Sequence, residues 1–195
     1  SSGSDTFVVT VNSLPTVNAG STRTLCFNEP QYNLASTAVP SGGTFFGPGV
    51  SGNFFTPSSA GVGTHTIYYT YTNGNGCSNT ATRTLTVTDL PTVNAGSNLF
   101  MCINGSLVDL TIGATPVNGT WSGPGLIGPT GIFNPALAGV GTHVINYTIT
   151  QSNGCSNFDE KIITVFPQLT IDAGPNFQVC SNGPAVNLNI GASAT

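Results

Sequence analysis

The chain has 195 residues, with three Lys or Arg, seven Asp or Glu and a formal net charge of −4. So few basic groups cannot neutralise a run of phosphates, which excludes a nucleic-acid-binding protein. No apolar run approaches the roughly 18 residues of a membrane-spanning helix, so we expect no membrane insertion. Hydrophobic residues make up 38% of the chain, and at low net charge this content is typical of a folded protein. The first ten residues have no basic stretch followed by an apolar core, so any export signal is expected outside this sequence.

An internal repeat of 76 to 78 residues runs through the sequence. Residues 14–21 read Leu-Pro-Thr-Val-Asn-Ala-Gly-Ser, and residues 90–97 are identical. Residues 60–65 read Ala-Gly-Val-Gly-Thr-His, and residues 138–143 are identical as well. Self-similarity at a fixed period is the signature of tandem structural repeats.

The repeat divides the chain into four segments. Residues 5–12 align with 82–88, the last strand of a copy, and a third copy begins near 169 and stops after its first part. We therefore interpret the chain as a window from a longer array. The expected segments are 1–13 as the final strand of a preceding repeat, 14–89 as repeat 1, 90–167 as repeat 2, and 168–195 as the first two strands of a truncated repeat 3.

Apolar and polar side chains alternate within each copy with the period of two that is typical of half-buried strands. In repeat 1 the segment 64–72 alternates in this way, and 82–88 follows after an Asn-Gly-Asn-Gly stretch that favours a hairpin. In repeat 2 we expect a strand at 108–112. No segment carries a helix signal. The residues expected to point inward are His65, Ile67, Tyr69 and Tyr71; Leu85 and Val87; Val108, Leu110 and Ile112; and His143, Ile145, Tyr147 and Ile149.

Short strands with turn residues every 8 to 12 positions predict a seven-strand sandwich for each complete copy. Trp121 is expected to be the large core residue of the third strand, with Phe45 at the same place in repeat 1. Immunoglobulin domains have a Trp at this place too. Cys102 lies six residues before the second strand instead of within it, so we expect a member of the sandwich class and not an antibody-type domain.

The repeat motifs resemble a known family. Together, Val-Asn-Ala-Gly, Gly-Thr-Trp-Ser-Gly-Pro-Gly, Ala-Gly-Val-Gly-Thr-His and Asn-Gly-Cys-Ser resemble the tandem PKD-like or immunoglobulin-like repeats of very large surface proteins in Bacteroidota. The resemblance covers essentially the whole chain. It implies an all-β fold of tandem immunoglobulin-like (PKD-like) β-sandwich repeats. It also implies an extracellular or cell-surface protein that is exported by the type 9 secretion system and linked to gliding motility.

Two histidines are the candidates for catalysis. His65 and His143 occupy the same position of the repeat, and no acidic residue recurs beside them. Without a convergent nucleophile, acid or metal ligand, we expect both to be structural core residues, as we do Tyr69 and Tyr147. We therefore expect no enzyme, no catalytic residue and no cofactor.

Calcium at the joints is an alternative, because extracellular arrays often hold Ca²⁺ there through six to eight oxygens. Asp89 is the acidic residue of one joint, and Ser13 and Pro167 take the equivalent positions elsewhere. One carboxylate is too few, so no metal site is expected. An isopeptide cross-link would need a Lys in every copy, yet Lys161 aligns with Arg83.

The outward threonines of 82–88 raise the alternative of ice or glycan binding. Thr is β-branched and suits strands for that reason alone. Glu160 and Ile162 also interrupt the row in repeat 2. We therefore favour an uncharged, solvent-exposed strand face over an ice-binding or glycan-binding surface.

Two functions are consistent with these patterns. The first is a rod or stalk segment of a large extracellular repeat protein such as a surface adhesin, because short joints with a proline leave no flexible linker. The alternative is a β-sandwich module that binds a glycan or a protein through loop 119–125 with Trp121. The expected partners are neighbouring repeats of the same chain, with secretion machinery and surface glycans as further candidates.

The cysteines predict a disulfide framework in an exported chain. Pairing within a copy, Cys26–Cys77 and Cys102–Cys155, is the default. However, the first strand and the final hairpin of a sandwich are expected to finish at opposite ends, which slightly favours the staggered pair Cys26–Cys155. Both registers remain open from the sequence. The candidates are Cys26, Cys77, Cys102, Cys155 and Cys180.

The third copy raises a separate expectation. Residues 168–195 supply only two strands, and an isolated two-stranded piece is marginal in water. We expect this piece to be disordered alone, with Val186, Leu188 and Ile190 uncovered unless another segment packs on them.

Overall fold

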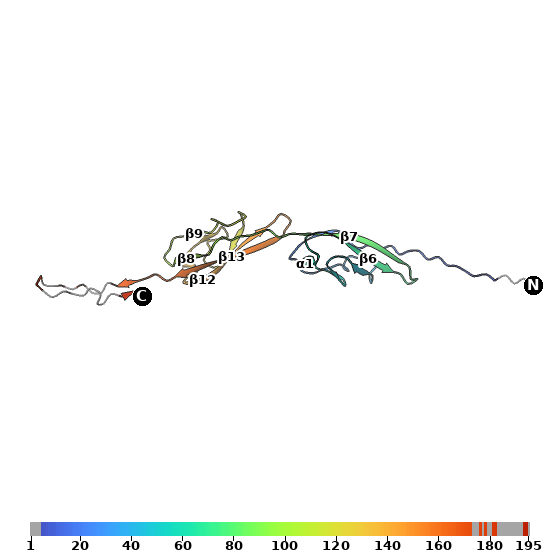
Figure 1. The fold of residues 1–195 in the computed structure, drawn as a ribbon, viewed down its shortest axis with the longest axis horizontal. Coiled ribbons are helices and arrows are strands. Elements are labelled where there is room, and N and C mark those ends of the chain that lie inside the picture. The colour runs from blue at the N-terminus through green and yellow to red at the C-terminus, as the bar shows by residue number, and fades with distance from the viewer. Residues whose placement is uncertain (1–4, 173–175, 177, 179–180, 183–192, 195) are drawn as a thin grey trace, which may run out of the picture. The chain divides into compact units, whose positions relative to one another are not determined.

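The computed structural model describes residues 5–172, 176, 178, 181–182 and 193–194. The chain divides into two compact units (Figure 1). Unit 1 comprises Ser1–Pro91 together with Gln151–Cys155, and unit 2 comprises Thr92–Thr150 and Ser156–Thr195. The expectations for Cys180, Val186, Leu188 and Ile190 concern positions outside the described residues.

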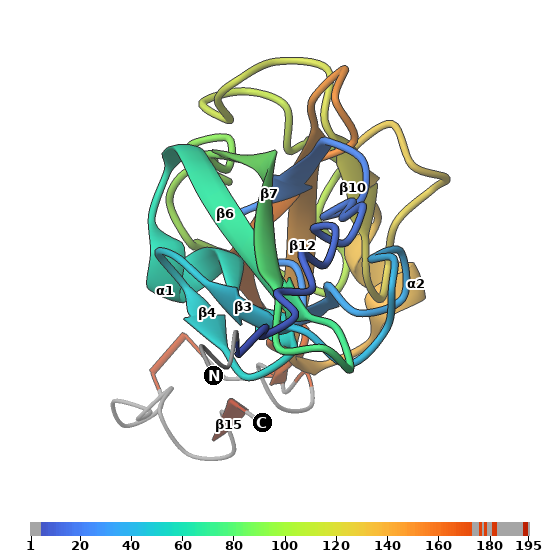
Figure 2. The same cartoon turned by 90° about the vertical axis from the view of Figure 1, so that its right-hand side faces the viewer.

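Unit 1 contains a four-stranded and a three-stranded sheet. Figure 2 labels β3, β6 and β7 of the larger sheet and β4 of the smaller one. The larger sheet has the order β1-β7-β6-β3, with β1 parallel to β7 and the other pairs antiparallel. The smaller sheet is antiparallel, in the order β2-β5-β4. The elements are β1 (Arg23–Cys26), β2 (Tyr32–Asn33), β3 (Thr44–Phe46), β4 (Val50–Ser51), β5 (Phe54–Phe55), α1 (Pro57–Ala60), β6 (Gly63–Thr72) and β7 (Ser78–Thr88).

Unit 2 repeats this arrangement. Its larger sheet has the order β10-β12-β13-β8, again with one parallel pair, β8 on β13. Its smaller sheet pairs β9 with β11, and a single bridge between Leu126 and Phe133 takes the place of the third strand. A separate pair, β14 with β15, lies toward the C-terminus. The elements are β8 (Leu99–Cys102), β9 (Val108–Asp109), β10 (Thr120–Ser122), β11 (Ile132–Phe133), α2 (Pro135–Ala138), β12 (Gly141–Thr150), β13 (Ser156–Phe166), β14 (Ile171–Asp172) and β15 (Ser193–Ala194).

Each unit has one hydrophobic core between its two sheets. In β6 and β7 every second side chain points inward, because successive side chains of a strand alternate between the faces of the sheet. Burying one large apolar side chain contributes about 1.5–3 kcal/mol, so these residues account for much of the folding free energy. The buried cores include Leu25, Leu34, Phe45, Phe55, Ile67, Tyr69, Leu85 and Val87 in unit 1, and Leu110, Trp121, Phe133, Ile145, Tyr147, Ile163 and Val165 in unit 2.

The predicted fold class is confirmed, since the described chain is almost all β and forms two-sheet sandwiches. The expectation that Ile112 points into the core is wrong, because its side chain is 77% exposed. Strand β9 ends at Asp109, whose carboxylate accepts hydrogen bonds from the backbone N–H (2.9 Å) and the hydroxyl (2.6 Å) of Thr111. This Asx-type turn competes with the sheet ladder and breaks the alternation after Leu110.

The prediction that the chain has no helix is also wrong, because two single-turn helices, α1 and α2, precede β6 and β12. In α2 the side chain of Asn134 accepts hydrogen bonds from the N–H groups of Ala136 and Leu137, and Pro135 stands at the first turn. An Asn cap followed by Pro is a local helix start. Four residues are too few to show a helical period, so the pattern search missed them.

The segment 5–12, expected to be the final strand of a preceding repeat, pairs with no strand of the described chain. Its apolar side chains are solvent-exposed, with Phe7, Val8 and Val11 at 88–90%. In the repeat alignment, Val9 and Val11 correspond to the buried Leu85 and Val87 of β7. Segment 5–12 therefore has the sequence of a core strand but is not paired with neighbouring strands of a sheet.

Candidate functional site: the Cys26–Cys155 disulfide

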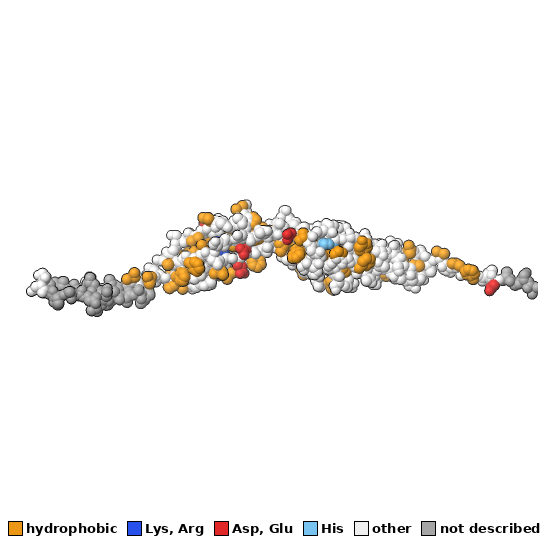
Figure 3. Space-filling model, in the orientation of Figure 1, with side chains coloured by type: hydrophobic (Ala, Val, Ile, Leu, Met, Phe, Trp, Pro, Cys, Tyr) orange, Lys and Arg blue, Asp and Glu red, His pale blue; other side chains and the backbone are white. Residues whose placement is uncertain are grey.

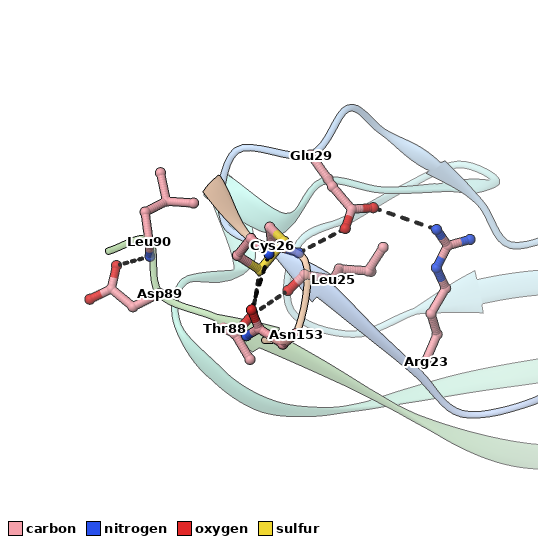
Figure 4. Close-up of a disulfide and its surroundings, with 9 residues drawn as sticks. Arg23, Leu25, Cys26, Glu29, Thr88, Asp89, Leu90 and Asn153 are labelled. Atoms are coloured by element: carbon pink, nitrogen blue, oxygen red, sulfur yellow. Dashed lines mark hydrogen bonds and ion pairs between the residues drawn. A yellow bond between two sulfur atoms is a disulfide. The ribbon is translucent and has the colours of Figure 1, made fainter. Parts of the chain in front are cut away.

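Strand β1 positions Cys26 at its C-terminal end. The parallel register on β7 places Cys26 opposite Thr88, and the N–H of Phe27 continues the ladder to the Thr88 carbonyl at 3.0 Å. The Glu29 carboxylate accepts a hydrogen bond from the Cys26 N–H at 2.9 Å and lies 3.5 Å from the Arg23 guanidinium (Figure 4). Both contacts join β1 to the turn that follows it.

The partner cysteine comes from the turn Gln151–Cys155, which belongs to unit 1 although it joins β12 to β13. The N–H of Gln151 donates to the Cys155 carbonyl at 2.8 Å, and the side-chain oxygen of Asn153 accepts from the Cys155 N–H at 3.0 Å. The Thr88 hydroxyl oxygen lies 3.1 Å from the Cys155 sulfur. This hydroxyl also donates to the Leu25 carbonyl at 3.2 Å.

A disulfide joins Cys26 to Cys155, with 5.5 Å between the Cα atoms and 129 residues of separation in sequence. This is the staggered register, which links the first copy of the repeat to the second. The default pairs within a copy, Cys26–Cys77 and Cys102–Cys155, do not form, and Cys77 and Cys102 have free thiols. The fifth cysteine, Cys180, lies outside the described residues.

Trp121 and Phe45 lie in the cores, on β10 and β3, with exposures of 2% and 5%. Each packs against a tyrosine with the rings tilted, Trp121 against Tyr147 at 4.5 Å and Phe45 against Tyr69 at 4.4 Å between ring centroids.

The two tyrosine hydroxyls make the same pair of hydrogen bonds in both units. In unit 2 the Tyr147 hydroxyl accepts from the Gly119 N–H at 2.8 Å and donates to the Pro116 carbonyl. A Cβ on Gly119 would collide with the Tyr147 ring, so only glycine fits there. In unit 1 the Tyr69 hydroxyl bonds Gly43 and Pro40 in the same way.

His65 and His143 lie on the inward face of β6 and β12 and are partly buried. In each, Nε2 lies within hydrogen-bonding distance of the carbonyl of the glycine that follows the short helix, Gly61 at 2.8 Å and Gly139 at 2.9 Å. A carbonyl only accepts, so Nε2 carries the proton. Each imidazole thereby ties the end of a helix to the following strand.

Sequence reasoning noted Arg83 and Lys161 but missed that both are buried, with exposures of 4% and 3%. Arg83 donates to the Thr37 hydroxyl at 3.1 Å and to the Tyr32 hydroxyl at 3.3 Å. Lys161 donates to the Ala95 carbonyl at 2.8 Å. Burial lowers the pKa of Lys161, because desolvation disfavours the charged ammonium. The missed signal was the position of both residues on the inward face of their strands.

The outward threonines of unit 1 pair with each other across β6 and β7. Hydroxyl oxygens lie 2.7 Å apart between Thr70 and Thr80, and 2.8 Å apart between Thr72 and Ser78. The face of the molecule that is drawn in Figure 3 carries few charged side chains. In unit 2, Phe158 and Ile162 stand exposed on the same face of the sheet. The threonine row is thus a hydrogen-bonded strand face, which Phe158 and Ile162 interrupt in the second copy.

No group of three or more His, Cys, Asp or Glu side chains suited to a metal ion occurs among the described residues. The Asp89 carboxylate accepts a hydrogen bond from the N–H of Leu90 at 2.8 Å. Across the same part of the chain, no helix is long and apolar enough to cross a membrane.

No family model matches the chain, and neither does any curated protein. Among solved structures, it is similar to Sidekick-1 immunoglobulin domains 1–4, with 18% identity, a TM-score of 0.28 and coverage of 82% of this chain and 54% of that one. It is also similar to protocadherin gamma B7 extracellular cadherin domains 1–4, with 10% identity, a TM-score of 0.27 and coverage of 88% and 56%. The chain spans a little over half the length of these structures. Its own sheets and cores define the class, tandem immunoglobulin-like β-sandwich repeats.

Proposed function

We propose that this chain is a structural segment of a large extracellular repeat protein, in which sandwich repeats form the rod or stalk of a surface adhesin. The observation that carries the proposal is the Cys26–Cys155 disulfide, which adds a covalent connection between successive copies of the repeat. Such a bond persists in an oxidising compartment and not in a reducing cytosol. A second connection of this kind suits a chain that carries tension, because the backbone is no longer the sole link.

The repeat motifs support the finer part of the proposal, export by the type 9 secretion system and a link to gliding motility. The main partners of each repeat in the array would be the neighbouring repeats of the same chain. A stalk segment performs this role without an enzymatic site. Antibodies raised against the chain should label intact cells of the source organism. Labelling only after lysis would contradict a surface location.

The stalk itself is tested by small-angle X-ray scattering on the oxidised 195-residue chain. A stalk segment is expected to give an elongated particle, with a maximum dimension well above that of a globular protein of 19.8 kDa. A compact, globular profile would rule out the stalk.

A second candidate function, binding of a glycan or a protein, has one observation in its favour. A cavity of about 450 Å³ in unit 2 is lined by Asn118, Trp121, Pro129 and Tyr147, among others. The indole N–H of Trp121 has no hydrogen-bond partner within the described residues. In this alternative a sugar hydroxyl accepts that hydrogen bond, which requires the indole N–H, buried in the core here, to become accessible from the cavity.

Trp121 is the chain's single tryptophan, so its fluorescence separates the two functions. A purely structural role predicts an emission that quenchers barely reach and that does not change with sugars. Ready quenching that falls when a sugar is added would favour the binding module.

A further inference from the structure

Cys102 has the same backbone surroundings as Cys26. The parallel pairing of β8 with β13 places Cys102 opposite Phe166, as β1 and β7 place Cys26 opposite Thr88. The N–H of Ile103 bonds the Phe166 carbonyl at 2.8 Å, matching the bond from Phe27 to Thr88. The N–H of Gly105 bonds the Cys102 carbonyl at 2.9 Å, matching the 3.0 Å bond from Glu29 to Cys26. Cys102 is therefore held as Cys26 is, but its thiol is free and exposed.

Cys77 lies in a turn with the same closing backbone hydrogen bond as the turn of Cys155. Its turn is closed by the N–H of Asn73 on the Cys77 carbonyl at 2.9 Å, as Gln151 closes the turn of Cys155. In both turns an asparagine side-chain oxygen accepts from the cysteine N–H at 3.0 Å, although the asparagines stand at different positions, Asn73 four residues before Cys77 and Asn153 two residues before Cys155.

The sulfur atoms supply an independent observation. The Cys77 sulfur lies 3.8 Å from the carbonyl oxygen of Asn12, and Asn12 is the repeat equivalent of Thr88. Thr88 is the residue that contacts the Cys155 sulfur and lies opposite the bonded Cys26. The side chains of Asn73 and Asn79 also donate to the carbonyls of Ser13 and Pro15, at 3.3 and 2.9 Å. The turn of Cys77 is thus docked beside the segment along which a partner strand would run.

We propose that Cys77 and Cys102 are sites for disulfides to neighbouring copies of this repeat, Cys102 to the turn cysteine of a following copy and Cys77 to the strand cysteine of a preceding copy. Each bond joins two thiols, with loss of two protons and two electrons. The electrons pass to a disulfide oxidant, either glutathione disulfide or a thiol oxidoreductase, which is reduced to two thiols. The inference rests on the proposed repeat array but not on its export route or its elongated shape.

The unpaired segment 5–12 indicates which partner Cys77 takes. Its exposed Val9 and Val11 match Leu85 and Val87, which are buried in the core of unit 1 on β7, a strand that lies between β1 and β6. A preceding copy of the repeat contributes the equivalents of these strands. Its strand cysteine would then stand beside Asn12, as Cys26 stands beside Thr88.

The first test extends the full chain at its C-terminus with a second copy of residues 118–167. Copy three aligns with copy two at an offset of 78, so the addition completes that copy and brings one new turn cysteine. After oxidation in a glutathione buffer, peptide mapping should find the new cysteine bonded to Cys102, with Cys26–Cys155 retained. Three alkylatable thiols are expected in the original chain and two in the extended one, although a cysteine has been added.

The second test places a second copy of residues 14–76 before Ser1, which aligns with the position of Cys77. The added strand cysteine should bond to Cys77, and the variant Cys77→Ser should leave it alkylatable. In both extended chains the Cys26–Cys155 bond reports oxidation within the same molecule. If that bond forms while Cys77 or Cys102 stays free, or if the added cysteine pairs within its own copy, the proposal is overturned. A compact scattering profile with the expected disulfides would instead overturn the stalk and leave this inference intact.

Discussion

Tyr147 holds the loop before β10 through a buried hydroxyl that accepts from Gly119 and donates to Pro116. The variant Tyr147→Phe keeps the ring but leaves both backbone groups without this partner. An unsatisfied buried polar group costs about 1–3 kcal/mol, so the free energy of unfolding of unit 2 should fall by that amount. Urea denaturation followed by Trp121 fluorescence measures the change. Tyr68→Phe is the control for loss of an exposed hydroxyl; because Tyr68 lies in unit 1, its unfolding is followed by circular dichroism, and it should change by less than about 0.5 kcal/mol, since this side chain is 39% exposed. Equal stability of Tyr147→Phe and the parent would contradict the assigned role.

Lys161 should titrate below its ordinary pKa of 10.5, because burial disfavours the ammonium. It is the chain's single lysine, so ¹³C-labelling of lysine gives one Cε resonance whose pH titration reads this pKa directly. The unfolded chain binds the proton more tightly than the folded chain. The contribution of Lys161 to the free energy of unfolding therefore rises with pH between the lowered pKa and 10.5. In Lys161→Met this contribution should vanish. A midpoint at or above 10.5 would contradict the burial argument.

At the scale of elements, the long strands were predictable and the short ones were not. Strands β6 and β7 are long enough for the alternation of apolar and polar residues to identify both the strand and its inward face. The alternation around Leu110 extended to Ile112 in the sequence, but a local hydrogen bond from the Thr111 N–H to the Asp109 carboxylate ends the strand first. A search for periodicity weighs hydrophobicity and does not weigh such competing local bonds.

The disulfide register was only partly predictable for a related reason. The spacing of the cysteines fixes their place in the repeat, but not the end of the sandwich at which each strand finishes. That depends on the parallel pairing of β1 with the end of β7, which puts Cys26 beside Thr88. The buried cations Arg83 and Lys161 were missed because a charge on an inward position contradicts the usual pattern of a strand.

The disulfide makes a prediction for the elements that it joins. In Cys155→Ser, strand β1 loses its covalent link to the turn Gln151–Cys155. Closing a loop of 129 residues is worth about 5 kcal/mol in the chain-entropy model, which is an upper value for the expected loss of unfolding free energy. Amide hydrogen exchange should show the loss as faster exchange in β1 and in the turn. Cys102→Ser removes a free thiol and should leave these amides unchanged; if Cys155→Ser does so too, the bond does not stabilise these elements.

At the scale of the whole molecule, a staggered disulfide differs from one within a copy in how the chain transmits force. When the chain is pulled at its ends, a disulfide within a copy protects only residues of that copy from being extended. The disulfide from Cys26 to Cys155 protects residues of two successive copies from being extended. Cys102 lies inside the loop that this disulfide closes. If Cys102 pairs with a following copy, successive loops overlap. No complete copy could then be extended without breaking a sulfur–sulfur bond.

This difference can be measured on the 195-residue chain by pulling on its two ends in a single-molecule force experiment. In the oxidised chain the loop between the bonded cysteines, which are 129 positions apart in sequence, cannot contribute to the extended length. Reduction should release this loop and lengthen the fully extended chain by about 450 Å, at roughly 3.3–3.6 Å per residue. Cys155→Ser should behave as the reduced chain without any reductant, whereas Cys102→Ser should behave as the oxidised parent. An extended length that reductant leaves unchanged would show that the bond carries no load, and the proposal of a tension-bearing stalk would lose the observation on which it rests.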